Sequence, residues 1–168
     1  MKEMTEKALK EAFAGESKAH MKYSIYSEIA QEKGYENLAR MWEAIAYAER
    51  VHARNHAENL GLIGDLEEDL EESFDGESFE VDEMYPVYHE TANIQAENGA
   101  RRSFHYALEA EKIHKTMYEQ AEEKVEKGED MDIDEIYICP TCGYTHYKGE
   151  LPDKCPVCGV KKEKFKEF

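Results

Sequence analysis

The chain has 168 residues, 35% of them charged, and its formal net charge at pH 7 is −17. That length allows one domain of ordinary size with a small appendage. The negative charge disfavours nucleic acid as a partner, and no apolar run reaches the roughly 18–20 residues that a membrane span needs.

Four helices are predicted in chain order, because apolar and aromatic residues recur at helical intervals in four long stretches. They are expected at residues 5–32, 36–60, 76–98 and 100–127. Gly34 favours a tight turn between the first two. Pro86 lies inside the third and removes a backbone hydrogen bond there. The strongly acidic stretch 61–75 is interpreted as a solvated connection.

Two Glu-x-x-His strings, 49–52 and 111–114, lie in the second and fourth helices. Residues three apart share a helix face, so each string offers a carboxylate beside an imidazole. Gly-Glu-Ser also occurs twice, at 15–17 and 76–78. The interval between the Glu of Gly-Glu-Ser and the Glu of Glu-x-x-His is 33 residues in the first half and 34 in the second. A two-helix hairpin is therefore used twice.

In antiparallel hairpins these spacings bring seven side chains to one level of a bundle. The candidate metal ligands are Glu16, Glu49, His52, Glu77, Glu80, Glu111 and His114. Five carboxylates in a bundle core would repel one another unless cations compensated them. The alternative is that each Glu reaches solvent at a helix edge. The matched spacings favour a dinuclear site of the ferritin-like kind, suited to iron or manganese, although zinc also fits.

The cysteines form a second metal site near the C-terminus. Two Cys-x-x-Cys-Gly loops are separated by twelve residues, and their thiols belong to Cys139, Cys142, Cys155 and Cys158. This pattern predicts a tetrahedral four-thiolate site, in which zinc would be structural and iron would carry one electron. The domains expected are a bundle at 1–134, with hairpins at 5–60 and 76–127, and a cysteine module at 135–168.

The setting expected from the sequence is the reducing cytoplasm. The N-terminus lacks the apolar core of a signal peptide, and the spacing of the cysteines is typical of a metal site more than of a disulfide framework.

Taken together, these motifs in this order resemble the rubrerythrin family. The resemblance implies an all-α four-helix bundle (ferritin-like) with a small C-terminal rubredoxin-like metal-knuckle domain. It also implies that Glu49 and Glu111 bridge two irons, that Glu16, Glu77 and His114 are terminal ligands, and that His52 and Glu80 alternate on one iron. Tyr23 and Tyr85 match the tyrosines that hydrogen-bond ligand carboxylates in the family.

The resemblance further implies a peroxidase that reduces hydrogen peroxide to water and protects against oxidative stress. Its cofactors would be two Fe in the carboxylate/histidine site and one Fe in the four-cysteine site, where zinc can substitute. Electrons would come from a separate rubredoxin or an NAD(P)H-dependent reductase. The chain has no Gly-x-Gly-x-x-Gly fingerprint for binding the nicotinamide itself.

Assembly as a homodimer is also expected. The cysteine module follows the fourth helix by a linker of about nine residues, which suggests that its metal lies far from the dinuclear site of its own chain. The resemblance implies that electrons pass instead from the cysteine module of one subunit to the dinuclear site of the other, in a head-to-tail dimer. The connection at 61–75 spans roughly 50 Å when extended, so exchange of helical hairpins between subunits is a further hypothesis.

Two other functions are compatible with the motifs. A ferroxidase of the ferritin type would use dioxygen and pass iron onward, but it would not need a cysteine module as an electron inlet. A non-enzymatic metal-binding module would hold structural zinc in the cysteine loops. Metal analysis separates this second alternative from the peroxidase.

Overall fold

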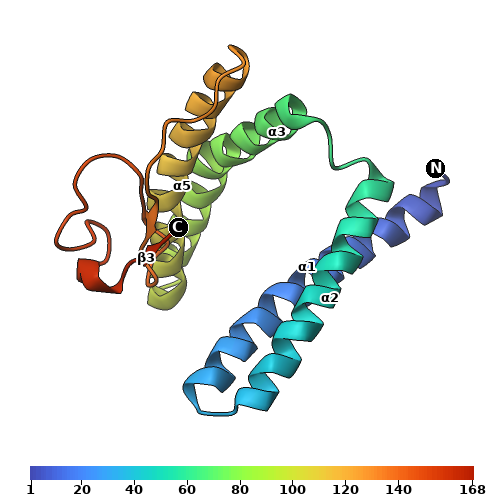
Figure 1. The fold of residues 1–168 in the computed structure, drawn as a ribbon, viewed down its shortest axis with the longest axis horizontal. Helices are drawn as coiled ribbons and strands as arrows, with labels where there is room; N and C mark the ends of the chain where they lie inside the picture. The colour runs from blue at the N-terminus through green and yellow to red at the C-terminus, as the bar shows by residue number, and fades with distance from the viewer. The chain divides into compact units, whose positions relative to one another are not determined.

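A computed structural model describes all residues from Met1 to Phe168. The chain divides into two compact units, Met1–Gly64 and Asp65–Phe168, and each is described by itself. Figure 1 shows the first as a helical hairpin, and the second as further helices with the C-terminal strands.

The first unit consists of α1 (Glu3–Glu32) and α2 (Glu36–Leu60). Gly34 adopts a positive φ of 78° in the turn between them, a conformation that favours glycine. The side chains buried in the hairpin are alanines only: Ala30, Ala39, Ala46, Ala53 and Ala57. Small side chains let the two helices approach closely, while larger apolar ones such as Ile25 and Ile45 remain exposed.

The second unit begins with a helix where the sequence had suggested a linker. Helix α3 (Leu66–Phe79) includes most of the acidic stretch 61–75, so the interpretation of that whole stretch as a solvated connection was wrong. The reason is a capping box. The Asp65 side chain accepts a hydrogen bond from the Glu68 backbone, and the Glu68 side chain accepts one from the Asp65 backbone. Acidic residues in this first turn also suit the helix dipole.

A π-helical turn, η1 (Glu80–Met84), follows α3 directly and leads into α4 (Tyr85–Ile94). Pro86 lies in the first turn of α4, where its missing N–H is tolerated because a wider turn precedes it. Helix α5 (Asn98–Val125) then returns along α3 and α4. The irregular turn therefore begins at Glu80, one of the candidate ligands.

The C-terminal module is a three-stranded antiparallel sheet in the order β2-β1-β3. Its elements are β1 (Tyr137–Ile138), β2 (Thr145–His146), the short 3-10 helix η2 (Lys162–Lys164) and β3 (Lys166–Glu167). Its core is made of three buried cysteines, with Tyr144, Phe165 and, from helix α5, Tyr106 packed against them. The module thus rests on α5 within the same compact unit.

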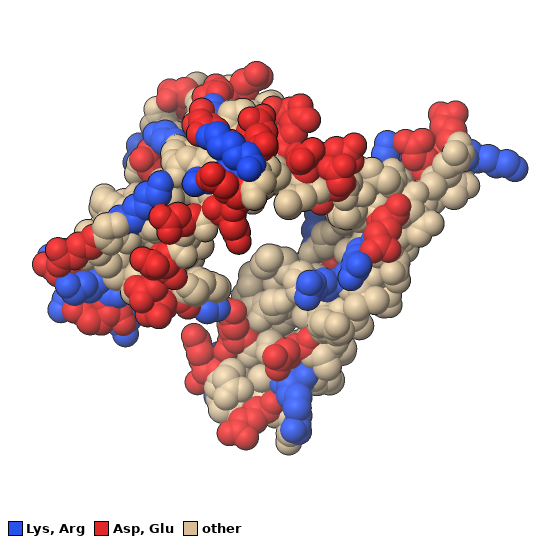
Figure 2. All heavy atoms as spheres, turned by 45° about the horizontal axis from the view of Figure 1, so that its top comes forward, with Lys and Arg blue, Asp and Glu red and all other residues tan.

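Acidic side chains cover more of the surface visible in Figure 2 than basic ones do, as the net charge of −17 leads one to expect. None of the helices combines the length and the apolar character that crossing a membrane demands.

Candidate metal centres

The four cysteines converge in two pairs. Cys139 Sγ lies 3.5 Å from Cys158 Sγ, and Cys142 Sγ lies 3.5 Å from Cys155 Sγ. These distances are far longer than a disulfide bond. They approach the roughly 3.7 Å expected between sulfurs that surround a metal tetrahedrally at about 2.3 Å. The cysteine positions therefore fit the predicted single-ion site.

The backbone of each loop turns as a thiolate site requires. The N–H of Gly143 donates to the carbonyl of Cys139, and the N–H of Gly159 donates to the carbonyl of Cys155, each at 2.9 Å. Both glycines have a φ of 78°. A side chain at either position would be strained, because this left-handed conformation favours glycine.

The first carboxylate/imidazole triad lies in the α1/α2 hairpin. Glu16 comes from α1, while Glu49 and His52 come from α2, and their ligand atoms lie within 4.8 Å of one another. His52 Nδ1 is 3.0 Å from Glu49 Oε2. Hydrogen bonds from His52 and Glu16 lower the pKa of Glu49. Three of the predicted ligands are therefore brought together as the spacing indicated.

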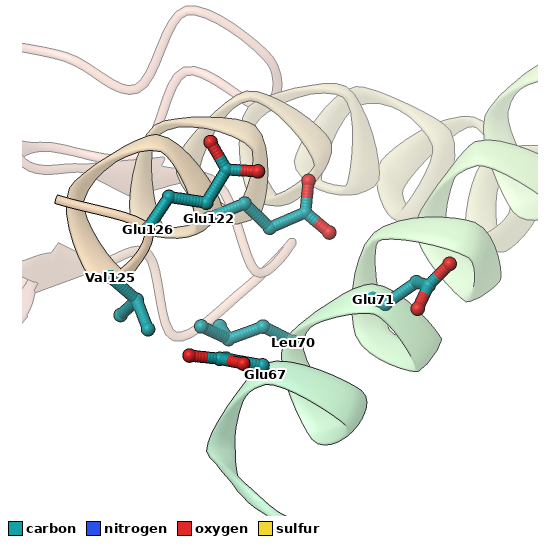
Figure 3. A pocket seen from close by; sticks show the side chains of 6 residues that line it. All are labelled: Glu67, Leu70, Glu71, Glu122, Val125 and Glu126. Carbon is teal, nitrogen blue, oxygen red and sulfur yellow. The ribbon is translucent and has the colours of Figure 1, made fainter.

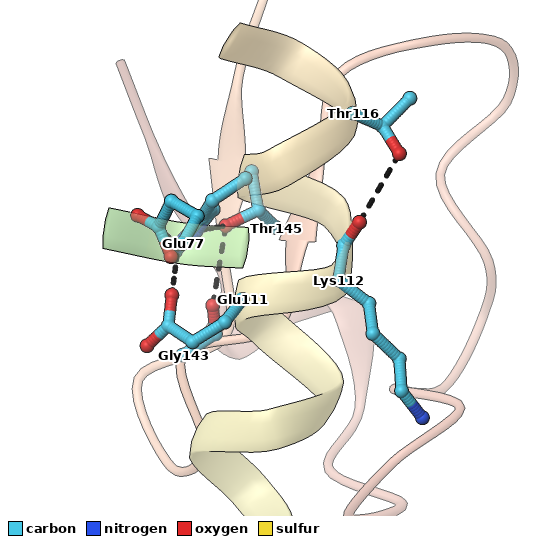
Figure 4. Close-up of polar contacts among 7 residues, drawn as sticks. Glu77, Glu111, Lys112, Thr116, Gly143 and Thr145 are labelled. Atoms are coloured by element: carbon cyan, nitrogen blue, oxygen red, sulfur yellow. Dashed lines mark hydrogen bonds and ion pairs between the residues drawn. The ribbon is translucent and has the colours of Figure 1, made fainter. Parts of the chain in front are cut away.

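The second triad repeats the first in the other unit. Glu77 comes from α3, while Glu111 and His114 come from α5, again with ligand atoms within 4.8 Å. His114 Nδ1 lies 2.6 Å from Glu111 Oε2 and 3.8 Å from Glu77 Oε1. The close contact with Glu111 raises the pKa of His114. Figure 4 shows the carboxylates of Glu77 and Glu111 facing each other.

Glu77 supplies the clearest sign that the second triad is built for a cation. Its Oε2 is buried and has no hydrogen-bond partner. Burial, followed by the contact with Glu111, raises the pKa of Glu77 to about 7. An orphaned carboxylate oxygen beside a second carboxylate and an imidazole fits a metal ion better than it fits a metal-free core. The donor set of oxygen and nitrogen suits iron.

The other three predicted site residues lie outside the triads. Glu80, at the start of η1, has a pKa raised by burial and by the charge of Glu111. Burial and the charge of Glu80 raise the pKa of Tyr85, whereas Tyr23 packs against Tyr26 with ring centroids 6.2 Å apart. Neither tyrosine hydroxyl makes a hydrogen bond to a carboxylate here, so that part of the prediction remains a prediction.

The structure adds one residue that the sequence motifs did not indicate. Thr145, in β2, places its Oγ1 2.8 Å from His114 Nε2. The cysteine module therefore contacts a candidate ligand of its own chain. The short linker had suggested instead that the metal of the module lies far from the dinuclear site of its own chain. No local motif marks Thr145, because its role depends on packing between residues 31 positions apart.

A further acidic cavity lies between α3 and α5, with a volume of about 390 Å³. Figure 3 shows its lining, which consists of Glu67, Leu70, Glu71, Glu122, Val125 and Glu126. Burial and the neighbouring charges of Glu71 and Asp75 raise the pKa of Glu122. No imidazole or thiol joins these carboxylates, which distinguishes the cavity from the two triads.

Comparison with known families gives two matches along the chain. Residues 7–122 match the family model described as rubrerythrin. Residues 137–166 match the model described as the rubredoxin-like domain of rubrerythrin. The first match alone covers more than half of the chain and includes both triads, and the second includes all four cysteines.

Full-length relatives agree with these matches. Rubrerythrin-2 of Clostridium acetobutylicum is 42% identical over 98% of this chain and 97% of its own length. Nigerythrin of Nitratidesulfovibrio vulgaris is 33% identical over 95% of this chain and 84% of its own length. A solved structure described as the fully reduced, all-ferrous state of nigerythrin superposes with a TM-score of 0.56, at 31% identity, over 98% of this chain and 86% of that one. The predicted fold class, a four-helix bundle with a small four-cysteine knuckle domain, is confirmed.

Proposed function

The chain belongs to the rubrerythrin family, and on that premise we propose that it is a peroxidase that reduces hydrogen peroxide to water and protects against oxidative stress. The observation that carries the proposal is the pair of Glu/Glu/His triads at corresponding positions of two hairpins, beside a four-cysteine site. Together these groups offer the ligands for two irons and for one further iron.

In the proposed site the ligands of both triads would bind one dinuclear centre. Glu49 and Glu111 would bridge the metals, and Glu16 and Glu77 would each bind one of them. His114 would bind one metal, and His52 and Glu80 would alternate on the other. Support comes from Glu77, whose buried Oε2 lacks a partner in the protein.

When bound, two ferrous irons would supply the two electrons that, with two protons, convert hydrogen peroxide to two waters, and the cysteine iron would restore those electrons singly. The protein's part is to hold the ligands and to manage protons. Burial raises the pKa of Glu80, so its carboxyl group is suited to hold a proton beside the site. Tyr85, near the same carboxylates, would orient a ligand oxygen through its hydroxyl group.

The electron donor in this proposal is an external protein, either a separate rubredoxin or an NAD(P)H-dependent reductase. Residues 139–168 contain six lysines and four acidic residues, a composition unlike the acidic remainder of the chain. With a net charge of +2, this part of the chain would repel an acidic donor less than the remainder does.

We further propose a homodimer in which hairpins are exchanged between subunits. Each compact unit holds one triad, so a dinuclear site needs one hairpin of each kind. The α1/α2 hairpin buries only alanines and exposes Ile25, Ile29 and Ile45, so it requires another apolar surface to complete its core. Exchange of identical elements is a common route to a dimer.

The function is tested by stopped-flow spectroscopy on iron-loaded protein reduced without oxygen. The protein is mixed separately with hydrogen peroxide and with dioxygen, and zinc-loaded protein serves as the control. We expect much faster oxidation by peroxide, followed by re-reduction through the cysteine iron. Faster oxidation by dioxygen, with iron accumulating beyond three per chain, would favour a ferroxidase instead. No redox change in protein shown to contain its iron would contradict both enzymatic functions.

A further inference from the structure

The cysteine module lies directly on the helix that carries the second Glu-x-x-His string. Tyr106 of α5 packs against the cysteine core. A Cβ atom built on Gly143 would lie 3.8 Å from the Cβ of Ala110, so the first cysteine loop approaches α5 to van der Waals contact. Farther along the helix, the Gln120 side chain hydrogen-bonds to Tyr147 and Lys148. This interface extends on both sides of His114.

Thr145 lies at the centre of that interface and only 3% of it is exposed. Its hydroxyl donates to the carbonyl oxygen of Gly143 at 3.2 Å (Figure 4). A hydroxyl has one proton to donate, so Thr145 Oγ1 is left to accept from His114 Nε2, 2.8 Å away. His114 Nε2 therefore donates a hydrogen bond to Thr145 Oγ1, and this contact holds the ring in place.

The other ring nitrogen is then directed at the carboxylates. His114 Nδ1 faces Glu111 Oε2 at 2.6 Å and Glu77 Oε1 at 3.8 Å. Which nitrogen of a histidine binds a metal is set by the hydrogen bond that the other makes. Without a metal, Nδ1 donates its proton to Glu111 at 2.6 Å. The contact of Nε2 with Thr145 keeps Nδ1 directed at the place between the two carboxylates where a metal would replace that proton.

The equivalent histidine in the first hairpin lacks such support. His52 Nδ1 lies 3.0 Å from Glu49, and its Nε2 makes no hydrogen bond in the structure. Its side chain is 53% exposed, whereas that of His114 is 32% exposed. The buried hydroxyl is therefore a property of the second triad, supplied by the cysteine module and not by the repeated hairpin.

We propose that Thr145 is a positioning residue, whose hydroxyl accepts from His114 Nε2 and fixes the orientation of the ring, so that the four-cysteine module organises the dinuclear site of its own chain. This inference rests on the proposed dinuclear site. It differs from the head-to-tail arrangement expected from the family, because the contact lies within one compact unit.

The first test observes His114 directly. Full-length protein is labelled with ¹⁵N-histidine and given one equivalent of zinc, which four thiolates bind in preference to carboxylates. Nitrogen NMR then reports whether the Nε2 proton of His114 is protected from exchange with water, with His114→Gln identifying the signal. We expect a protected Nε2–H signal in the wild type and in Thr145→Ser, and its loss in Thr145→Val and in Thr145→Ala. An unchanged signal in both apolar variants would overturn the proposal.

The second test measures iron binding by the dinuclear site. Losing a hydrogen-bond partner of a ligating histidine typically weakens metal binding about 10–100-fold, so Thr145→Val should release iron at least tenfold more readily than Thr145→Ser. The absorption of the cysteine iron serves as the folding control. If the module does not fold in Thr145→Val, Thr145→Ala is used in its place. Equal iron affinity in the serine and apolar variants would contradict the positioning role.

The two proposals fail separately. If the wild type does not reduce peroxide but Thr145→Val still loses the His114 signal, the proposed function is wrong and the positioning role stands. If the wild type is a peroxidase but the apolar variants keep both the signal and the iron affinity, Thr145 has no positioning role and the function stands.

Discussion

His52 and His114 hold the same place in the two repeats, each three residues after a glutamate, yet their surroundings differ. The His52 side chain is 53% exposed, and a hydrogen bond from it lowers the pKa of Glu49. His114 is 32% exposed, touches a buried threonine and lies beside Glu77, whose pKa is raised to about 7. Identical motifs therefore give an open triad in one hairpin and a half-buried triad in the other, because only the second is covered by the cysteine module.

The largest effect on activity is expected when either triad loses the glutamate of its Glu-x-x-His string. Glu49→Ala and Glu111→Ala should each lower peroxide reduction by more than about 100-fold, since even outer-shell changes at metal sites cost about 10–100-fold. The measurement is steady-state peroxide consumption by protein reconstituted with iron. Near-normal activity in one variant would show that a single triad suffices.

The same two variants test hairpin exchange. Chains carrying Glu49→Ala and Glu111→Ala are co-expressed with different tags, and the mixed dimer is purified. With exchange, one intact α1/α2 hairpin meets one intact second hairpin, so about half of the wild-type activity should return. A mixed dimer as inactive as each parent would show that every site is built within one chain.

Loss of the cysteine iron should stop the delivery of electrons to the dinuclear site without stopping the reaction of that site with peroxide. In Cys155→Ser the four-thiolate site is incomplete, so turnover with an external donor should fall to the background rate. The dinuclear site, once reduced chemically, should still be oxidised by peroxide. The two steps are followed as steady-state turnover and as a single stopped-flow oxidation. Unchanged steady-state turnover would mean that electrons bypass the cysteine module.

A smaller effect is expected on the stability of the metal-free dinuclear site. The pKa of Glu77 is about 7 in the folded protein and ordinarily 4.5. The unfolded chain therefore binds fewer protons between these values, and this group's contribution to stability falls as pH rises from 4.5 to 7. Glu77→Gln should raise the free energy of unfolding at pH 8 by at most about 3.4 kcal/mol, the equivalent of this pKa shift, and leave it nearly unchanged at pH 4.

The matched variant for this comparison is Glu49→Gln. The pKa of Glu49 is lowered by hydrogen bonds from His52 and Glu16, so removing its charge should give no gain in stability at pH 8. Urea unfolding at the two pH values, with iron removed from the dinuclear site and one zinc per chain, measures both variants. A gain of equal size in both would show that the triads do not differ electrostatically.

The smallest effect is expected from the tyrosines. Tyr85 lies near enough to Glu80, Glu111 and Glu77 for their charges to help raise its pKa. Tyr85→Phe should therefore slow peroxide reduction by less than about tenfold, with a change in the absorption of the oxidised dinuclear site. Tyr23→Phe is the matched variant in the first hairpin and should behave alike if both hydroxyls orient ligands. If neither variant changed the rate or the spectrum, both tyrosine rings would serve only to pack against their neighbours.

The sequence was sufficient for the parts of the molecule that depend on local spacing. Residues three apart on a helix share a face, so the association of Glu49 with His52 and of Glu111 with His114 could be predicted. The interval between repeats also placed Glu16 and Glu77 beside them. The cysteine site followed from the two loops, whose spacing leaves few other uses for four thiols.

Other features of the structure could not be predicted, because local sequence signals conflicted or because the contact joins residues far apart in the chain. The acidic composition of 61–75 indicated a linker, but the capping box at Asp65 and Glu68 starts a helix there. The π-helical turn at Glu80 could not be located, although Pro86 marked a disturbance nearby. Thr145 has no sequence signature, because its contact with His114 exists only once the cysteine module packs on α5.

The central claim is that the two triads together hold one dinuclear iron centre that peroxide oxidises. Mössbauer spectroscopy on ⁵⁷Fe-loaded protein, reduced without oxygen and treated with one equivalent of hydrogen peroxide per chain, tests it most directly. We predict that two irons per chain are oxidised together and form a magnetically coupled pair, separate from the signal of the cysteine iron. Magnetically isolated irons that are oxidised independently of each other would contradict the account.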